Sequence, residues 1–274
     1  MNRRGLGLFE VLIALTLTGV VSVLVWSILQ TAAFRLRDRS ERMAMEHALR
    51  VAAVALRASL EPLGHDSTAG SDLALIAPDG FVARAIRGSG VVCAAGATAL
   101  VVRAAAGWWN ALRVPVAGRD SVMVGTITGP PRWVVADLIG APSSGSCPDG
   151  TEALHVPVAL ALVDLASIGP GSPLRVFEPM ELQAYSSGGA AWLGLRSVSS
   201  GGSIQPLAGP FTGAAMTLSY FSRSGGGALL PGGVATAAWR INGTTERMGG
   251  IGVARVPWAQ TDSGGGFVRL RNAP

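Results

Sequence analysis

An uncharged, strongly apolar run opens the chain. From Val11 to Phe34 there are 24 residues without a formal charge, which as an α-helix would extend about 36 Å. That length is enough to cross a bilayer with some tilt. One carboxylate, Glu10, stands directly before the run, where an unpaired charge is costly if it enters the membrane.

Beyond Phe34 the pattern becomes that of an amphipathic helix. Its apolar residues recur at steps of three and four, which places them in a single stripe. Pro62 and Gly64 end the pattern. We therefore predict one helix of about 55 residues, half in lipid and half packed on a domain, which is too long for an ordinary globular element. The stripe consists of Met45, Leu49, Ala52, Ala53, Leu56, Leu60 and Leu63.

From about residue 70 the pattern changes to short β-like runs between clusters of Gly, Pro and Ser, and no second helix is expected. The two Pro-Asp-Gly triplets, at 78–80 and 148–150, predict turns. The predicted strands are 73–77, 80–86, 98–104, 121–127, 132–139, 153–163, 180–185, 191–196, 215–222, 236–241, 250–256 and 267–271.

Composition narrows the class of protein. With 49% hydrophobic and 14% charged residues among 274, the chain is too apolar to be disordered, and it has too few long apolar segments for a multi-pass membrane protein. All 22 basic residues are arginine, and the net charge is +5. After residue 60 the arginines are scattered singly, without interleaved aromatic residues, so no nucleic-acid partner is expected.

Three interpretations of the N-terminus compete. A secretory signal peptide shares the basic start, Arg3 and Arg4, but its apolar region is shorter, and Glu10 falls where that region should begin. A plain signal anchor explains the length but not the glutamate. The third interpretation is that residues 1–5 and the following "LGLFE" resemble a type IV prepilin leader. Such a leader is short and basic and ends in glycine, and a glutamate follows at mature position five.

The resemblance implies cleavage between Gly5 and Leu6 and N-methylation of Leu6. Leu6 and Gly7 depart from the phenylalanine and threonine that are frequent at the first two mature positions. Cleavage creates an α-amino group four residues from Glu10, on the same helix face. The family implies that this amine, of the same or a neighbouring subunit, pairs with Glu10 and sets the axial register. The alternative is a glutamate that extends to the lipid headgroups without a partner.

Charge alone does not orient the span. Arg3 and Arg4 precede it, and Arg35, Arg37 and Arg39 follow it. The resemblance implies the orientation, since the prepilin peptidase acts at the cytoplasmic face. The protein is then a single-pass inner-membrane protein with a periplasmic C-terminal domain, later part of a fibre. The implied partners are the prepilin peptidase, other minor and major pilins or pseudopilins, the inner-membrane assembly platform and membrane lipid.

Patterns in the C-terminal part resemble the J-type minor pseudopilin of type II secretion and its W-type relative in type IV pili. They are the hairpin "MELQAYSSGGAAWLGLRS", the strand "MTLSYFSRSGGG" followed by "GGIGVARV", and the terminal "FVRLRN". The resemblance implies an α+β, pilin-like lollipop, with a long N-terminal helix packed on an antiparallel β-sheet head that holds two sheets. The expected parts are a leader (1–5), a transmembrane helix half (6–34), an amphipathic helix half (35–64) and a β-rich periplasmic head (65–274).

Cysteine usage agrees with an oxidising compartment. Cys93 and Cys147 are the only two cysteines, and both follow the span. In the periplasm we expect them to pair, and the alternative is two unrelated buried thiols. Two cysteines and three scattered histidines do not favour a metal site, and no metal or cofactor is expected.

No catalytic residues are expected. The segment "TDSGGG" resembles the loop around the nucleophile of trypsin-like proteases, but Thr261 replaces the first glycine and only 11 residues follow Ser263. We interpret it as a Gly/Ser loop before the last strand. The expected function is therefore a non-enzymatic minor pilin or pseudopilin at or near the tip of a type II secretion pseudopilus or type IV pilus. The alternative is a signal-anchored periplasmic enzyme or binding protein.

Overall fold

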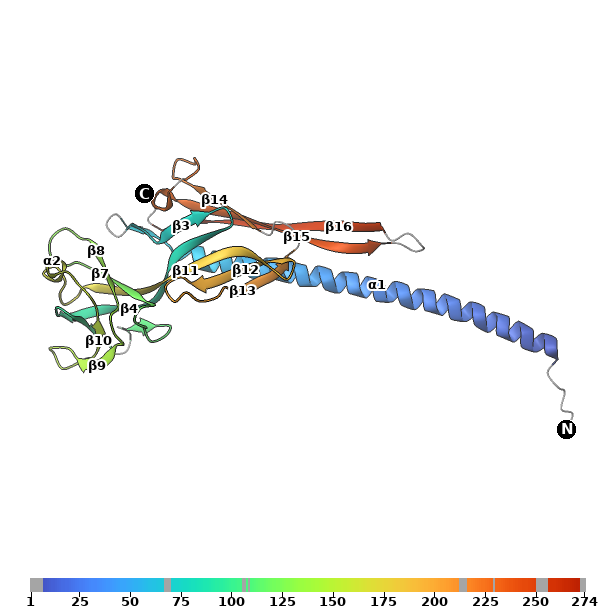
Figure 1. Ribbon diagram of the computed structural model, residues 1–274, viewed down its shortest axis with the longest axis horizontal. Helices are drawn as coiled ribbons and strands as arrows, with labels where there is room; N and C mark the ends of the chain where they lie inside the picture. The colour runs from blue at the N-terminus through green and yellow to red at the C-terminus, as the bar shows by residue number, and fades with distance from the viewer. Residues whose placement is uncertain are drawn as a thin grey trace, which may run out of the picture. The chain divides into compact units, whose positions relative to one another are not determined.

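A long helix and a set of antiparallel sheets make up the chain in a computed structural model (Figure 1). The structure describes residues 7–66, 70–104, 107, 109–211, 216–228, 230–249 and 256–271. These fall into two compact units. The first holds the described residues up to His47 and those of 245–260, and the second holds Ala48 to Thr244 and those from Thr261 onward.

Helix α1 runs from Leu8 to Leu60. It contains no proline and a single glycine, Gly19, so nothing in its interior breaks the backbone hydrogen bonds. Its last three turns belong to the second unit, where the predicted stripe is buried: Ala52, Leu56 and Leu60 have no exposed surface. The predicted α+β class, with one long N-terminal helix and an antiparallel β-sheet head, is confirmed.

The described strands pair in an antiparallel sense and form sheets of eleven, three and two strands. A single helical turn, α2 (Leu162–Leu165), and a 3-10 turn, η1 (Pro231–Gly233), lie between strands. The strands are β1 (His65–Asp66), β2 (Gly70–Ser71), β3 (Leu73–Ala77), β4 (Gly80–Ala95), β5 (Ala99–Arg103), β6 (Asn110–Ala111), β7 (Ser121–Gly125), β8 (Trp133–Asp137), β9 (Ser143–Ser146), β10 (Glu152–Pro157), β11 (Pro173–Ser187), β12 (Ala190–Ser197), β13 (Gln205–Phe211), β14 (Met216–Phe221), β15 (Thr236–Gly249) and β16 (Val256–Arg269).

Two long strands, β4 and β11, form the centre of the eleven-stranded sheet. They pair with each other from Gly80–Gln183 to Val91–Pro173, with an irregularity after Val176. The other edge of β11 pairs first with β7 and then with β12, and β12 pairs with β13. The other edge of β4 pairs with β3, β6 and β5. Both strands therefore belong to two differently built regions of one sheet.

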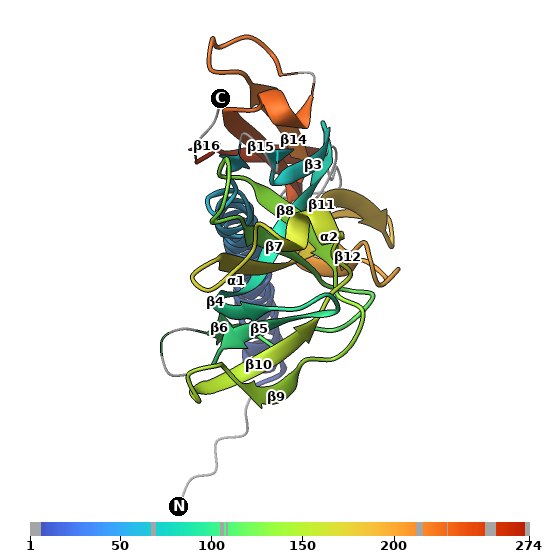
Figure 2. The same cartoon turned by 90° about the vertical axis from the view of Figure 1, so that its left-hand side faces the viewer.

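In the first of these regions six strands close into a ring, in the order β4, β5, β10, β8, β7, β11. Closure occurs just after β8 and β10, where Leu138 and Val158 form an antiparallel bridge. The Ile139 amide donates to the Pro157 carbonyl at 3.1 Å, and the Ala159 amide donates to the Asp137 carbonyl at 3.3 Å. Figure 2 views the head from the side on which β7, β8 and β10 lie.

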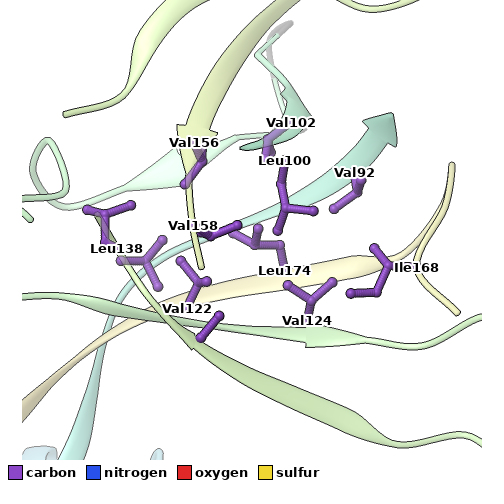
Figure 3. Packing of buried hydrophobic residues seen from close by; sticks show 12 residues of the cluster. Val92, Leu100, Val102, Val122, Val124, Leu138, Val156, Val158, Ile168 and Leu174 are labelled. Carbon is purple, nitrogen blue, oxygen red and sulfur yellow. The ribbon is translucent and has the colours of Figure 1, made fainter. Parts of the chain in front are cut away.

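Aliphatic side chains from all six strands fill the interior of the ring. These side chains point toward one another in the space between the strands (Figure 3). Alternation along each strand places them there, because every second side chain of a strand faces the same side. The buried members are Val92, Leu100, Val102, Val122, Val124, Ala136, Leu138, Val156, Val158, Ile168, Leu174 and Val176.

Several predicted strands have different bounds in the structure. The predicted strand 153–163 is too long, because β10 ends at Pro157 and pairing then continues only as far as the Val158 bridge and the Ala159 amide. The chain then forms α2, a single helical turn, so the expectation of no second helix is also wrong. The hairpin of β11 and β12 is confirmed, with Tyr185 opposite Trp192. Most of the predicted strand 250–256 lies outside the described residues.

The predicted Gly/Ser loop at 261–266 is also wrong, because this segment lies inside β16. A Cβ atom on Gly266 would lie 2.5 Å from the ring of Trp239. Glycine at this position of β16 therefore leaves room for the indole of Trp239 from β15 to pack against the backbone. Gly266, and to a lesser degree Gly265 with the Trp239 carbonyl oxygen 3.1 Å from its Cβ position, therefore serve the packing between β15 and β16.

Candidate functional site

The N-terminal half of α1 presents an apolar surface on every side. Between Leu8 and Phe34 the large apolar side chains are exposed, from 44% for Val11 and Ile13 to 84% for Leu8. Among the described residues, α1 is the one helix long and apolar enough to cross a membrane, as an anchor or as a signal sequence. Such a surface is stable in lipid or against other apolar helices.

Four hydroxyl groups within this half donate to carbonyls of the same helix. Thr18 and Ser22 each donate at 2.7 Å to the carbonyl four residues earlier, and Thr31 does so at 2.9 Å. Thr16 donates at 2.9 Å to the Ile13 carbonyl. In hydrocarbon an unpaired hydroxyl is costly, so these bonds suit the surface to a membrane.

Glu10 lies in the first turn of α1 and bonds to the start of its own helix. A Glu10 carboxylate oxygen accepts a hydrogen bond from the Gly7 amide at 3.2 Å, and the Glu10 and Val11 amides donate to the Gly7 carbonyl at 3.0 and 3.3 Å. This is half of a capping box, in which Gly7 is the N-cap and the glutamate three residues later satisfies its amide. The negative charge also suits the positive end of the helix dipole.

This bond turns the carboxylate toward the preceding residues. Gly5 and Leu6, the predicted cleavage and methylation positions, lie outside the described residues. By covalent geometry, the Leu6 nitrogen is only three bonds from the Gly7 nitrogen that Glu10 accepts from. An amine created at Leu6 would therefore start next to the group that the carboxylate already binds. The Gly7-to-Glu10 spacing of a capping box was present in the sequence, but sequence reasoning missed it.

Charged residues follow the apolar half of the helix. Arg37 Nε donates to Glu41 at 3.0 Å, and Arg42 Nε donates to Glu46 at 2.9 Å. Both pairs are exposed and join residues four apart, which stabilises a helix by only about 0.3 to 0.5 kcal/mol each. They mark the end of the part of α1 suited to lipid.

In the head, Cys93 and Cys147 form a disulfide with a Cα–Cα distance of 5.8 Å. The predicted pairing is confirmed. Both residues are buried with Ala153 of β10 and the partly buried Val101 of β5. Cys93 lies on β4 next to the inward-facing Val92, and Cys147 follows β9. The bond therefore ties β4 to the turn before β10 outside the ring core.

A group of charges lies where β4 and β11 pass from one region of the sheet to the other; its two carboxylates are buried, and its three arginine side chains are 22% to 40% exposed. Glu178 of β11 has no exposed surface and accepts hydrogen bonds from Arg87 at 2.8 Å, Arg113 at 3.0 Å and Arg119 at 2.5 Å. Arg113 also donates two bonds of 2.6 Å to the buried Asp120. We call these five residues the Glu178 cluster.

The arginines of the cluster determine the charge state of Glu178. Burial alone raises the pKa of a carboxyl, but hydrogen bonds from Arg119, Ser197 and Arg113 and the charge of Arg87 outweigh it and lower the pKa of Glu178 to about 2. The carboxylate therefore stays ionised at physiological pH. The partners lie 59 to 91 residues away in sequence, so no local pattern could have indicated the cluster.

Comparison with models of protein families, with curated proteins and with solved structures finds no match to this chain. The architecture itself, a long N-terminal apolar helix with an antiparallel β-sheet head, agrees with the expected pilin-like organisation.

Proposed function

We propose that the chain is a minor pilin or pseudopilin, a non-enzymatic subunit of a type II secretion pseudopilus or type IV pilus. The prepilin peptidase cleaves it between Gly5 and Leu6 and methylates the new N-terminus. It then resides in the inner membrane with its head in the periplasm, and leaves the bilayer to join other pilins or pseudopilins at or near the fibre tip. The inner-membrane assembly platform inserts it.

The position of the Glu10 carboxylate carries this proposal. It stands at the start of an exposed apolar helix and bonds to Gly7, beside the residue that would become the mature N-terminus. A helix leaving lipid for a bundle buries this charge, and burial is tolerable when a cation pairs with it. The Leu6 amine of the same or a neighbouring subunit supplies that cation. A plain membrane anchor would not need a carboxylate at this position.

Three variants of the full-length chain separate cleavage, charge and helix capping. Gly5→Val blocks processing, because the peptidase requires the glycine. Glu10→Gln leaves processing intact and keeps the cap, since glutamine also serves at the third position of a capping box. Without its counter-ion the amine is buried alone, which costs on the order of 3 to 5 kcal/mol. Glu10→Gln is therefore processed and membrane-resident but fails to co-purify with the other pilin-like subunits.

Glu10→Ala and Glu41→Gln complete the design. Glu10→Ala removes both the charge and the cap, whereas Glu41→Gln removes a carboxylate from an exposed ion pair further along α1. We expect Glu41→Gln to assemble normally. If Glu10→Gln assembles and only Glu10→Ala fails, the carboxylate acts as a helix cap alone. If the wild-type chain keeps residues 1–5 in cells that contain the peptidase, it is a signal-anchored protein of another kind.

A further inference from the structure

Two arginines, Arg35 and Arg39, follow the uncharged apolar run of α1 at its C-terminal end, the end from which the chain continues toward the head. Arg35 follows the uncharged run immediately, and Arg39 comes four residues later, so both lie on one helix face about 6 Å apart along the axis. Both side chains are exposed. The apolar neighbours of Arg35, Phe34 and Leu36, are 54% and 66% exposed.

These two guanidinium groups differ from their neighbours in having no ion-pair partner within the described residues. Arg37 and Arg42 are each bound to a glutamate four residues on. Asp38, which lies between Arg35 and Arg39 in sequence, has an interaction of its own. Arg35 and Arg39 therefore supply the guanidinium donors on this face that have no ion-pair partner in the part of the chain that the structure describes.

Their depth along the helix matches that of phospholipid headgroups. The uncharged run is about 36 Å long, slightly more than the hydrocarbon core, so a residue directly after it reaches the polar interface. A planar guanidinium binds phosphate through two parallel hydrogen bonds. Phe34 and Leu36 beside Arg35 are apolar residues of the kind that interfacial helices bury at the boundary between acyl chains and headgroups.

In the proposed orientation Arg35 and Arg39 lie on the periplasmic side of the membrane. This is unfavourable by the positive-inside rule, under which arginines next to a span are enriched on the cytoplasmic side. Cleavage also removes Arg3 and Arg4, so the mature span is flanked by arginines on the head side only. A binding role on that side gives a physical reason for the arrangement.

We propose that Arg35 and Arg39 form a binding site for the phosphate of an anionic phospholipid in the leaflet that faces the head. The inference rests on the proposed membrane anchoring of α1. The bound lipid holds the helix at a fixed depth before assembly, and the site releases it when the subunit leaves the bilayer. Since the attraction is electrostatic, added salt weakens it.

The test uses the full chain in uncharged detergent, titrated with fluorescent phosphatidylglycerol and, separately, with phosphatidylcholine. We expect wild type to prefer phosphatidylglycerol. Arg35→Gln and Arg39→Gln each weaken that binding about fivefold, the equivalent of about 1 kcal/mol per charge near an anionic surface. The double variant loses the preference. Arg50→Gln is the matched control, because Arg50 is an exposed arginine on the same helix, 15 residues after Arg35.

Several results overturn the proposal. It is wrong if the double variant keeps its preference, or if Arg50→Gln weakens binding as much as Arg35→Gln does. Inorganic phosphate is tested alone and as a competitor at matched ionic strength. If it binds wild type but not the double variant and displaces the lipid, the site is one for free phosphate.

Two further readouts distinguish failure of this site from failure of the proposed function. Alkaline extraction of membranes reports anchoring, and we expect the double variant to stay in the membrane like wild type. Release of both proteins from the membrane refutes the anchoring itself. If lipid preference is unchanged while co-purification with pilin subunits is lost, the two arginines contact a neighbouring subunit and the lipid site is wrong.

Discussion

Replacing the buried carboxylate of Glu178 should destabilise the head much more than the loss of an exposed carboxylate does. In Glu178→Gln three arginines remain, with only Asp120 to balance them. Removing one partner of a fully buried ion pair costs about 3 to 5 kcal/mol, because the remaining charge is left uncompensated. The arginines here keep some contact with water, being 22% to 40% exposed, so we expect the lower end of that range, about 3 kcal/mol. For a head of this size that corresponds to a fall in Tm of about 6 to 12 °C.

The pH dependence follows from the lowered pKa of Glu178. Its ordinary value is 4.5 and its value in the folded head is about 2, which corresponds to about 3 kcal/mol of stabilisation. A carboxyl with a lowered pKa contributes fully above its unfolded value. The contribution is then lost as pH falls from about 4.5 toward 2. Wild type should lose more stability across this window than Glu178→Gln does.

Thermal unfolding of the full chain in detergent, followed by circular dichroism, measures both effects. Glu181→Gln is the matched control, since Glu181 lies on the same strand and pairs with Arg196, which is 45% exposed. Such a pair contributes less than about 1 kcal/mol. Removing one surplus arginine as well, in Glu178→Gln with Arg119→Gln, should recover part of the loss. Equal Tm values for the Glu178 and Glu181 variants would refute the reasoning.

Two other predictions concern the ring and its surroundings. Replacing Cys93 and Cys147 by serine should cost about 4 kcal/mol, because the bond closes a loop with a sequence separation of 54. Unfolding midpoints in denaturant measure this, and quantitative thiol labelling of unreduced wild type would contradict it. Gly80→Ala should cost about 1 to 3 kcal/mol, since its Cβ would lie 2.5 Å from the Leu182 carbonyl oxygen. Gly232→Ala, with no atom within 4 Å of the new Cβ, is its control and should unfold like wild type.

The sequence predicted the helix because its signals are local. The stripe through Ala52, Leu56 and Leu60 follows directly from a 3.6-residue period, and Pro62 ends it. The disulfide was also predictable, because two cysteines in an oxidising compartment have only one pairing within the chain. The helix can be predicted from residues that are close in sequence, and the disulfide from the number of cysteines alone.

The rest depends on partners distant in sequence. The segment "RGSG" at 87–90 looks like a break after residue 86, yet β4 continues through it because β11 supplies hydrogen bonds on one side. Pro206 and Pro210 argue against a strand at 205–211, but β13 is the edge of its sheet, where a missing amide costs little. Glu178, between Phe177 and Pro179, gives no local sign that three distant arginines surround it.

The shared strands of the sheet determine how the head responds to load. Domains usually meet at linkers where few contacts cross. Here the boundary between the ring and the remaining sheet is crossed by β4 and β11, continuous strands of 16 and 15 residues. Neither region can open while these strands keep their pairing. A partner that binds the ring therefore also restrains β12 and β13, because both regions share β4 and β11, and force applied to one region of the eleven-stranded sheet is passed directly to the other.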